Sequence, residues 1–82
     1  MVYLDIISII YPMNKEEIAH YITTRRQLLA LNQEDVAAMA GITAKTIYMI
    51  ESGKGNPSLE TLQKLLTVLG LTIQLKIKSI PE

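Results

Sequence analysis

The chain has 82 residues, 49% of them hydrophobic, and contains neither cysteine nor tryptophan. This length allows one small domain, and the absence of cysteine excludes a disulfide framework and thiolate metal sites. Eight basic residues balance eight acidic residues. A formal net charge of zero argues against strong non-specific nucleic-acid binding, so a nucleic-acid site would depend on where the basic residues lie.

The chain begins with an apolar segment over residues 1–11, MVYLDIISIIY, which is rich in β-branched residues and could be a strand. It lacks a basic n-region and a small-residue cleavage site, so we do not expect a signal peptide. No apolar run approaches the ~20 residues that span a bilayer. We therefore expect a cytoplasmic protein without a membrane anchor, and Met13 is an alternative start of the native chain.

Two helices are predicted next, over about residues 14–30 and 33–40. The first begins with the capping-box spacing of Asn14 and Glu17. Its apolar residues recur at helical spacing and are Ile18, Tyr21, Ile22, Leu28 and Leu29. Asn32 is expected to cap the second helix, and Gly41 to end it. The inner face of this second helix is expected to contain Val36, Ala37 and Ala40.

A third helix is predicted over about residues 44–52, capped by Thr43, with Ile47 and Ile50 pointing inward. Residues 52–57, SGKGNP, are dense in turn formers and predict a loop. Ser58 is expected to cap a fourth helix that ends at Gly70. The apolar stripe of this helix contains Leu59, Leu62, Leu65, Leu66 and Leu69.

The pattern changes after Gly70. Residues 71–78, LTIQLKIK, alternate strictly between apolar and polar, which predicts a half-buried C-terminal strand over 71–79. A strand must pair its backbone groups with a neighbour. That neighbour is either the segment 1–11 or the same strand of a second copy, and we expect a homodimer. The apolar side of the strand, expected in the dimer interface, contains Leu71, Ile73, Leu75 and Ile77.

The segment 31–70, LNQEDVAAMAGITAKTIYMIESGKGNPSLETLQKLLTVLG, resembles the helix-turn-helix domain of phage repressors and xenobiotic-response-element (XRE) regulators. The positions that carry this resemblance are Leu31, Gln33, Ala37, Gly41, Ile42, Thr43, Thr46, Ile47, Glu51, Ser52, Gly53, Asn56, Pro57 and Ser58. The resemblance implies a mainly α, lambda-repressor-like fold with a four-helix core over residues 14–70. The helix that follows Gly41 would enter the major groove of double-stranded DNA.

The resemblance also assigns roles to individual positions. Base edges would meet Thr43, Ala44, Lys45 and Met49, with Lys45 the one charged side chain among them. Phosphates or the adjoining backbone would meet Gln33, Thr46, Tyr48, Lys54, Asn56 and Arg25. An ion pair of structural importance is expected between Arg26 and Glu51. Ala44 and Met49 depart from the polar or basic residues of many relatives, which leaves few base contacts in each monomer.

The predicted C-terminal strand resembles that of HipB-type antitoxins. This narrower resemblance implies a repressor that autoregulates its own operon as part of a toxin–antitoxin module. It leaves open a HipA-like kinase toxin as a further partner. Two alternatives remain: a protein-interaction module that neutralises a partner while binding DNA weakly, and a phage-type repressor outside any toxin system.

Catalytic and metal-binding functions are not indicated. His20 is the single histidine, the serines have no matching base, and most of the acidic residues lie in the first turns of separate helices. The glycines around Lys54 lack the spacing and the preceding strand of a phosphate-binding loop. We therefore expect no enzyme activity, metal or cofactor. Residues 33–52 have one further interpretation, in which the two helices pack together for stability alone and bind no ligand.

Overall fold

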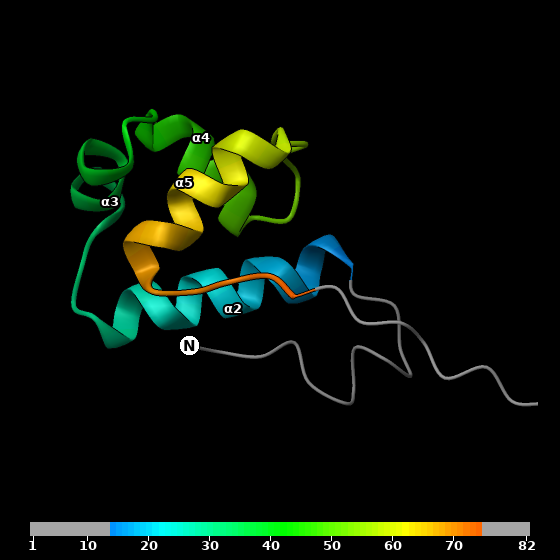
Figure 1. The fold of residues 1–82 in the computed structure, drawn as a ribbon, viewed down its shortest axis with the longest axis horizontal. Coiled ribbons are helices and arrows are strands. Elements are labelled where there is room, and N and C mark those ends of the chain that lie inside the picture. Colours follow the sequence, from blue (N-terminus) through cyan, green and yellow to red (C-terminus); the bar gives the residue numbers. More distant parts are fainter. Residues whose placement is uncertain (1–13, 75–82) are drawn as a thin grey trace, which may run out of the picture.

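The computed structural model describes residues 14–74, which contain four helices. Their bounds are α2 (Lys15–Leu28), α3 (Gln33–Ala40), α4 (Ala44–Glu51) and α5 (Leu59–Leu69). In Figure 1, α2 runs along the bottom of the view, and α3, α4 and α5 lie above it. Helix α4 packs against α2 and α3, and α5 packs against α3 and α2. Within residues 14–74, none of the helices has the length and apolar character needed to cross a bilayer.

Each of the four helices begins with a side-chain cap. The capping oxygen accepts a hydrogen bond from the backbone N–H three residues later, over 2.7 to 3.1 Å. The four caps are the predicted residues Asn14, Asn32, Thr43 and Ser58. These bonds satisfy N–H groups that have no partner inside the helix, so the polar residue before each apolar pattern determines where the helix starts.

The core lies where the inner faces of all four helices meet. Its fully buried side chains are Ile22, Val36, Ile47, Leu65 and Leu69. The small side chain of Ala37 is 6% exposed and belongs to the same cluster. The predicted inward positions of α3 and α4 are therefore confirmed for Val36, Ala37, Ile47 and Ile50, whereas Ala40 is only half-buried.

Three leucines predicted on apolar faces are instead exposed. Leu28 is 73% exposed, Leu29 39% and Leu59 65%. Helix α2 ends at Leu28, two residues earlier than predicted, so Leu29 and Ala30 form a turn and leave the helical face. Ala30 adopts a left-handed conformation with φ of 58°, where an L-residue is strained. Leu59 occupies the first position of α5, whereas the buried residues of this helix, Leu65, Leu66 and Leu69, lie in its second half.

The turn between α3 and α4 uses Gly41 as predicted. Gly41 has φ of 71°, and the N–H groups of Gly41 and Ile42 both donate to the Ala37 carbonyl, at 2.9 and 3.1 Å. Ile42 then packs against the core. This tight turn fixes the direction in which α4 leaves α3, and so determines which residues of α4 face outward.

Residues 71–74 contain no strand, so the predicted C-terminal strand is not formed in this part of the chain. The Leu71 N–H instead donates to the Leu66 carbonyl at 2.9 Å, and the Leu71 side chain packs against the core. A strand requires a partner strand, and within residues 14–74 no segment is a strand that could pair with residues 71–74. The remainder of the predicted strand, with Leu75 and Ile77, and the segment 1–11 lie outside the described residues.

Candidate nucleic-acid interface

The N-terminus of α4 differs from those of the other three helices. The first turns of α2, α3 and α5 each contain at least one acidic residue, whereas that of α4 contains none. The exposed Lys45 lies in this turn instead. The Thr43 hydroxyl accepts the Thr46 N–H at 3.1 Å and lies 2.8 Å from the Thr46 hydroxyl. The positive end of this helix is therefore not neutralised by a carboxylate of its own first turn.

Four of the predicted DNA-binding residues line one open hollow of about 360 Å³ between α4, the following loop and α5. They are Lys45, Thr46, Met49 and Asn56. Thr61, on the first turn of α5, lines the same hollow and was not predicted. The cap at Ser58 fixes the position of that turn, but only the packing of α5 brings it beside α4.

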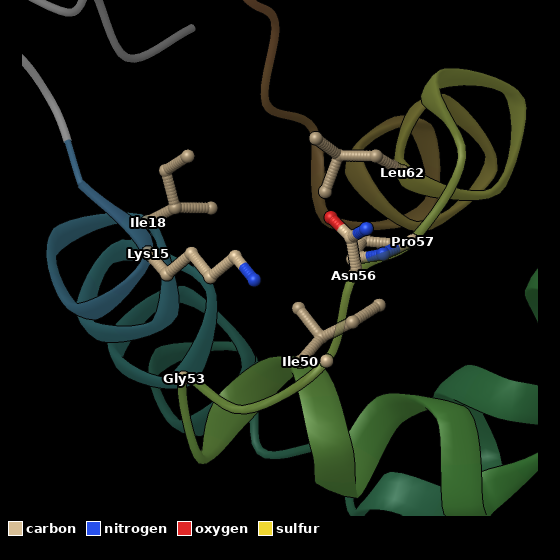
Figure 2. A pocket seen from close by; sticks show the side chains of 8 residues that line it. Lys15, Ile18, Ile50, Gly53, Asn56, Pro57 and Leu62 are labelled. Atoms are coloured by element: carbon tan, nitrogen blue, oxygen red, sulfur yellow. The ribbon is translucent and has the colours of Figure 1, made fainter.

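A second hollow, of about 180 Å³, lies on the other side of the loop, where Asn56 and Pro57 line both spaces. Figure 2 shows the Lys15 side chain extending from the start of α2 toward this loop. Ile18, Ile50 and Leu62 make most of its wall apolar. Lys15 is thus a third exposed lysine near the loop, and the sequence alone did not indicate it.

The remaining residues of the predicted interface differ in accessibility. Thr43 and Lys54 are exposed, and Tyr48 is 58% exposed. Ala44 is half-buried and packs against the core, so only part of its methyl group can face a ligand. The small Ala44 side chain therefore contributes to helix packing and also forms part of the outer surface.

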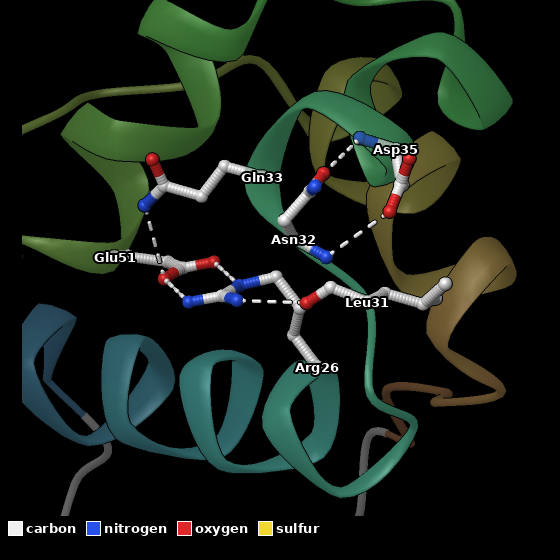
Figure 3. A network of polar contacts seen from close by, with 6 residues as sticks. All are labelled: Arg26, Leu31, Asn32, Gln33, Asp35 and Glu51. Atoms are coloured by element: carbon white, nitrogen blue, oxygen red, sulfur yellow. Dashed lines mark hydrogen bonds and ion pairs between the residues drawn. The ribbon is translucent and has the colours of Figure 1, made fainter.

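The Arg26–Glu51 ion pair is present and joins α2 to the end of α4. Arg26 Nε and Nη2 donate to the two Glu51 carboxylate oxygens at 2.7 and 2.8 Å, and Nη1 donates to the Leu31 carbonyl at 2.9 Å (Figure 3). The two side chains are only 14% and 6% exposed. A bidentate pair with this little exposure holds three parts of the chain together.

The pair also shifts the pKa values of both groups. Burial, the largest single influence, acts to raise the pKa of Glu51, but the hydrogen bonds from Arg26 and Gln33 and the charge of Arg26 outweigh it. The net effect lowers the pKa of Glu51 below its ordinary value of 4.5. The hydrogen bond to Glu51 raises the pKa of Arg26.

Gln33 and Arg25 both have partners within the protein. Gln33 Nε2 donates to Glu51 Oε1 at 3.3 Å, which connects the first residue of α3 to the ion pair. Arg25 Nε donates to the Leu69 carbonyl at 2.8 Å, at the C-terminal end of α5. This bond uses Nε alone, so a contact of the Arg25 side chain with a phosphate stays a prediction. Arg25 completes the end of α5, and the hollow beside α4 does not include it.

Comparison with known proteins identifies the family. Residues 22–76, more than half of the chain, match the family described as Helix-turn-helix (HTH_3). The chain belongs to the XRE-type helix-turn-helix family. The match includes the second half of α2, the whole of α3, α4 and α5, and the hollow beside α4.

Similar members of the family are named as transcriptional regulators. An uncharacterized HTH-type transcriptional regulator of Haemophilus influenzae is 42% identical over 52 residues, which are 63% of this chain and 53% of the relative. The HTH-type transcriptional regulator PuuR of Escherichia coli is 44% identical over 48 residues, 58% of this chain and 26% of PuuR. DdrOP3 of Deinococcus deserti is 42% identical over 48 residues, 58% of this chain and 37% of that protein. The matched part is therefore about half or less of each relative.

Proposed function

We propose that the protein is a sequence-specific DNA-binding transcriptional repressor that presents α4 to the major groove. The observation that carries this proposal is the hollow lined by Lys45, Thr46, Met49 and Asn56 at a helix N-terminus without acidic residues. Lys45 would donate to a guanine edge, and Met49 would pack against base methyl groups. The names of the relatives as transcriptional regulators support the same function.

Phosphate contacts would surround this base-reading region. Gln33, the first residue of α3, precedes α4 in the sequence. Lys54 and Asn56 follow the C-terminal end of α4, and Lys15 lies across the loop. The backbone N–H of Gln33 has no acceptor inside α3 and can donate to a phosphate, against the negative charge of Glu34 and Asp35 in the same turn. Few phosphate contacts per monomer fit the zero net charge, and a dimer would double them.

An apolar groove on α5 supports a second proposed function, association of two copies of the chain. An open hollow of about 430 Å³ is lined by α5 and residues 71–73, with Leu59, Leu66, Leu71 and Ile73 on its wall. Leu59 is 65% and Ile73 38% exposed. Apolar side chains exposed side by side are typical of an interaction surface. We propose that a second copy of the chain covers this groove through residues 71–79.

The finer setting we propose is that of a HipB-like antitoxin, which would repress its own operon and hold a HipA-like kinase toxin. The apolar alternation of residues 71–78 supports this proposal. A phage-type repressor outside any toxin system remains the alternative. A gene neighbour that encodes a kinase-like protein, and that copurifies with this chain, would distinguish the two.

DNA selection tests the central part of this function. Purified protein is used to enrich binding duplexes from a randomised pool. The enriched duplexes, and the DNA upstream of the gene that encodes the protein, are then titrated with the protein at two salt concentrations. We expect two half-sites about 34 Å apart, and affinity that falls with salt. Failure to enrich any sequence, together with no preference for the upstream segment, would contradict the proposal.

Two lysine variants identify the reading helix. Lys45→Ala should weaken binding to the selected site by about tenfold or more and reduce discrimination at one base pair, as expected for a lost base contact. Lys64→Ala removes the same charge from α5, where Lys64 lies 3.7 Å from Glu60. It should change affinity by about twofold or less. Equal losses in both variants would mean that Lys45 contributes charge alone.

A further inference from the structure

The side-chain amide of Gln33 is held in one orientation by a carboxylate from a different helix. Its Nε2 donates to Glu51 Oε1 at 3.3 Å, and the same oxygen accepts from Arg26 Nη2 at 2.8 Å (Figure 3). Rotation of the amide by half a turn would bring its carbonyl oxygen against the carboxylate, where two acceptors repel each other. The carboxylate therefore selects the orientation with the nitrogen toward Glu51.

Glu51 is itself fixed and cannot adjust to Gln33. Both carboxylate oxygens are bonded to Arg26, whose third nitrogen is bonded to the Leu31 carbonyl. The Glu51 side chain is only 6% exposed. Gln33 is half-buried and follows Asn32, whose cap fixes the backbone at the start of α3. The amide is thus restrained from its backbone end and from its nitrogen.

One Nε2 hydrogen is used by Glu51. Among residues 14–74 no partner is found for the second hydrogen, which can therefore donate to a bound ligand. The backbone N–H of Gln33 lies at the first position of α3, where helical N–H groups lack internal acceptors. Both donors belong to the same residue. An anionic oxygen at the start of α3 could accept from both.

We propose that Glu51 is a positioning residue for DNA binding: it fixes the Gln33 amide so that its second N–H and the α3 N-terminus bind one phosphate. This inference rests on the proposed DNA binding and goes beyond a structural role of the ion pair. The Gln33 side chain is already restricted to one rotamer in the free protein, so DNA binding does not incur the entropy cost of ordering it. The expected gain is about 2- to 10-fold in affinity, the range for one immobilised side chain.

A double-mutant comparison separates positioning from stability. The double variant Arg26→Leu/Glu51→Leu replaces the buried pair by apolar residues of similar size, a change that folded proteins often tolerate. It removes the acceptor that orients Gln33. Gln33→Leu should weaken binding to the selected duplex several-fold in wild type, but by less than about twofold in the double variant. An equal loss in both backgrounds overturns the inference.

A spectroscopic measurement on the free wild-type protein needs no substitution. The two Nε2 protons of Gln33 should have well-separated chemical shifts, and the side chain should show restricted motion in ¹⁵N relaxation. The exposed glutamines Gln27 and Gln63 provide the mobile reference. A Gln33 amide as mobile as Gln63 overturns the inference even if the double variant fails to fold. Absence of DNA binding by wild type overturns the proposed function as well, whereas the relaxation result concerns Gln33 alone.

Discussion

Loss of the Glu51 side chain should lower the stability of the domain strongly. Glu51→Ala leaves the Arg26 guanidinium buried at 14% exposure without its carboxylate. Removal of one partner from a buried pair costs about 3 to 5 kcal/mol, a large part of the stability of a small domain. Urea denaturation should show this loss. A change below about 0.5 kcal/mol, as for an exposed pair, would contradict the structural role.

The acid sensitivity of the protein should depend on the same carboxylate. The pKa of Glu51 is lower in the folded protein than its ordinary value of 4.5, so its contribution to stability is present above that value. That contribution is lost as the pH falls through the lowered folded pKa. The wild type should therefore lose more stability than the Arg26→Leu/Glu51→Leu variant between about pH 5 and pH 2. Parallel stability curves for the two proteins would contradict this assignment.

Ala30 occupies a position that suits glycine. Its φ of 58° is strained for alanine, and its side chain is exposed, so little packing is lost when the methyl group is removed. Ala30→Gly should raise the free energy of unfolding by about 0.5 to 1 kcal/mol, because relief of strain exceeds the added freedom of the unfolded chain. Thermal and urea denaturation measure this change. A lower stability would show that the left-handed turn is not strained.

At the scale of elements, the turn between α3 and α4 determines how α4 is presented. A Cβ added at Gly41 would meet no atom within 4 Å, so Gly41→Ala tests the left-handed backbone alone. It should cost about 1 to 2 kcal/mol, and Gly41→Asn less, because asparagine tolerates this conformation better. Equal effects of the two substitutions on urea denaturation would contradict this explanation.

Helix starts could be predicted closely from the sequence because each cap is a local interaction between residues three apart. Asn14, Asn32, Thr43 and Ser58 were all identified in this way. The end of α2 could not be predicted in this way. Position 30 is an alanine and not the glycine that commonly follows a helix, and the apolar Leu28 and Leu29 suggested that the helix continues. Leu29 lies in the turn that follows α2, and a hydrophobic pattern does not show where such a turn begins.

The candidate site was predictable only in part. The family resemblance indicated Lys45, Thr46, Met49 and Asn56, which line one hollow. The contacts between Gln33 and Glu51 and between Arg25 and Leu69 join residues 18 and 44 positions apart. Such contacts depend on how the helices pack, and local spacing does not predict them. For the same reason, Thr61 and Lys15 were recognised beside the loop only in the structure.

For the whole molecule, the proposed dimer depends on residues beyond Leu71. The test is a truncated variant that lacks residues 72–82. It keeps Leu71, because the side chain of Leu71 packs against the core. Sedimentation should then show a monomer with intact helices. Ile73→Lys should weaken the dimer, whereas Gln74→Lys, which adds the same charge on the other face of the predicted strand, should not. A shortened chain that stays dimeric would contradict the proposed interface.

The measurement that tests the account most directly is a titration of the backbone amide signals with the selected duplex. We expect the largest chemical-shift changes at the start of α3, along α4 and in the loop through Asn56, with little change at the exposed Leu59 and Gln63 of α5. Signals of Lys45 and Gln33 should shift together at the same DNA concentration. If the changes centre on α5 and residues 71–74 instead, α4 is not the DNA-reading helix.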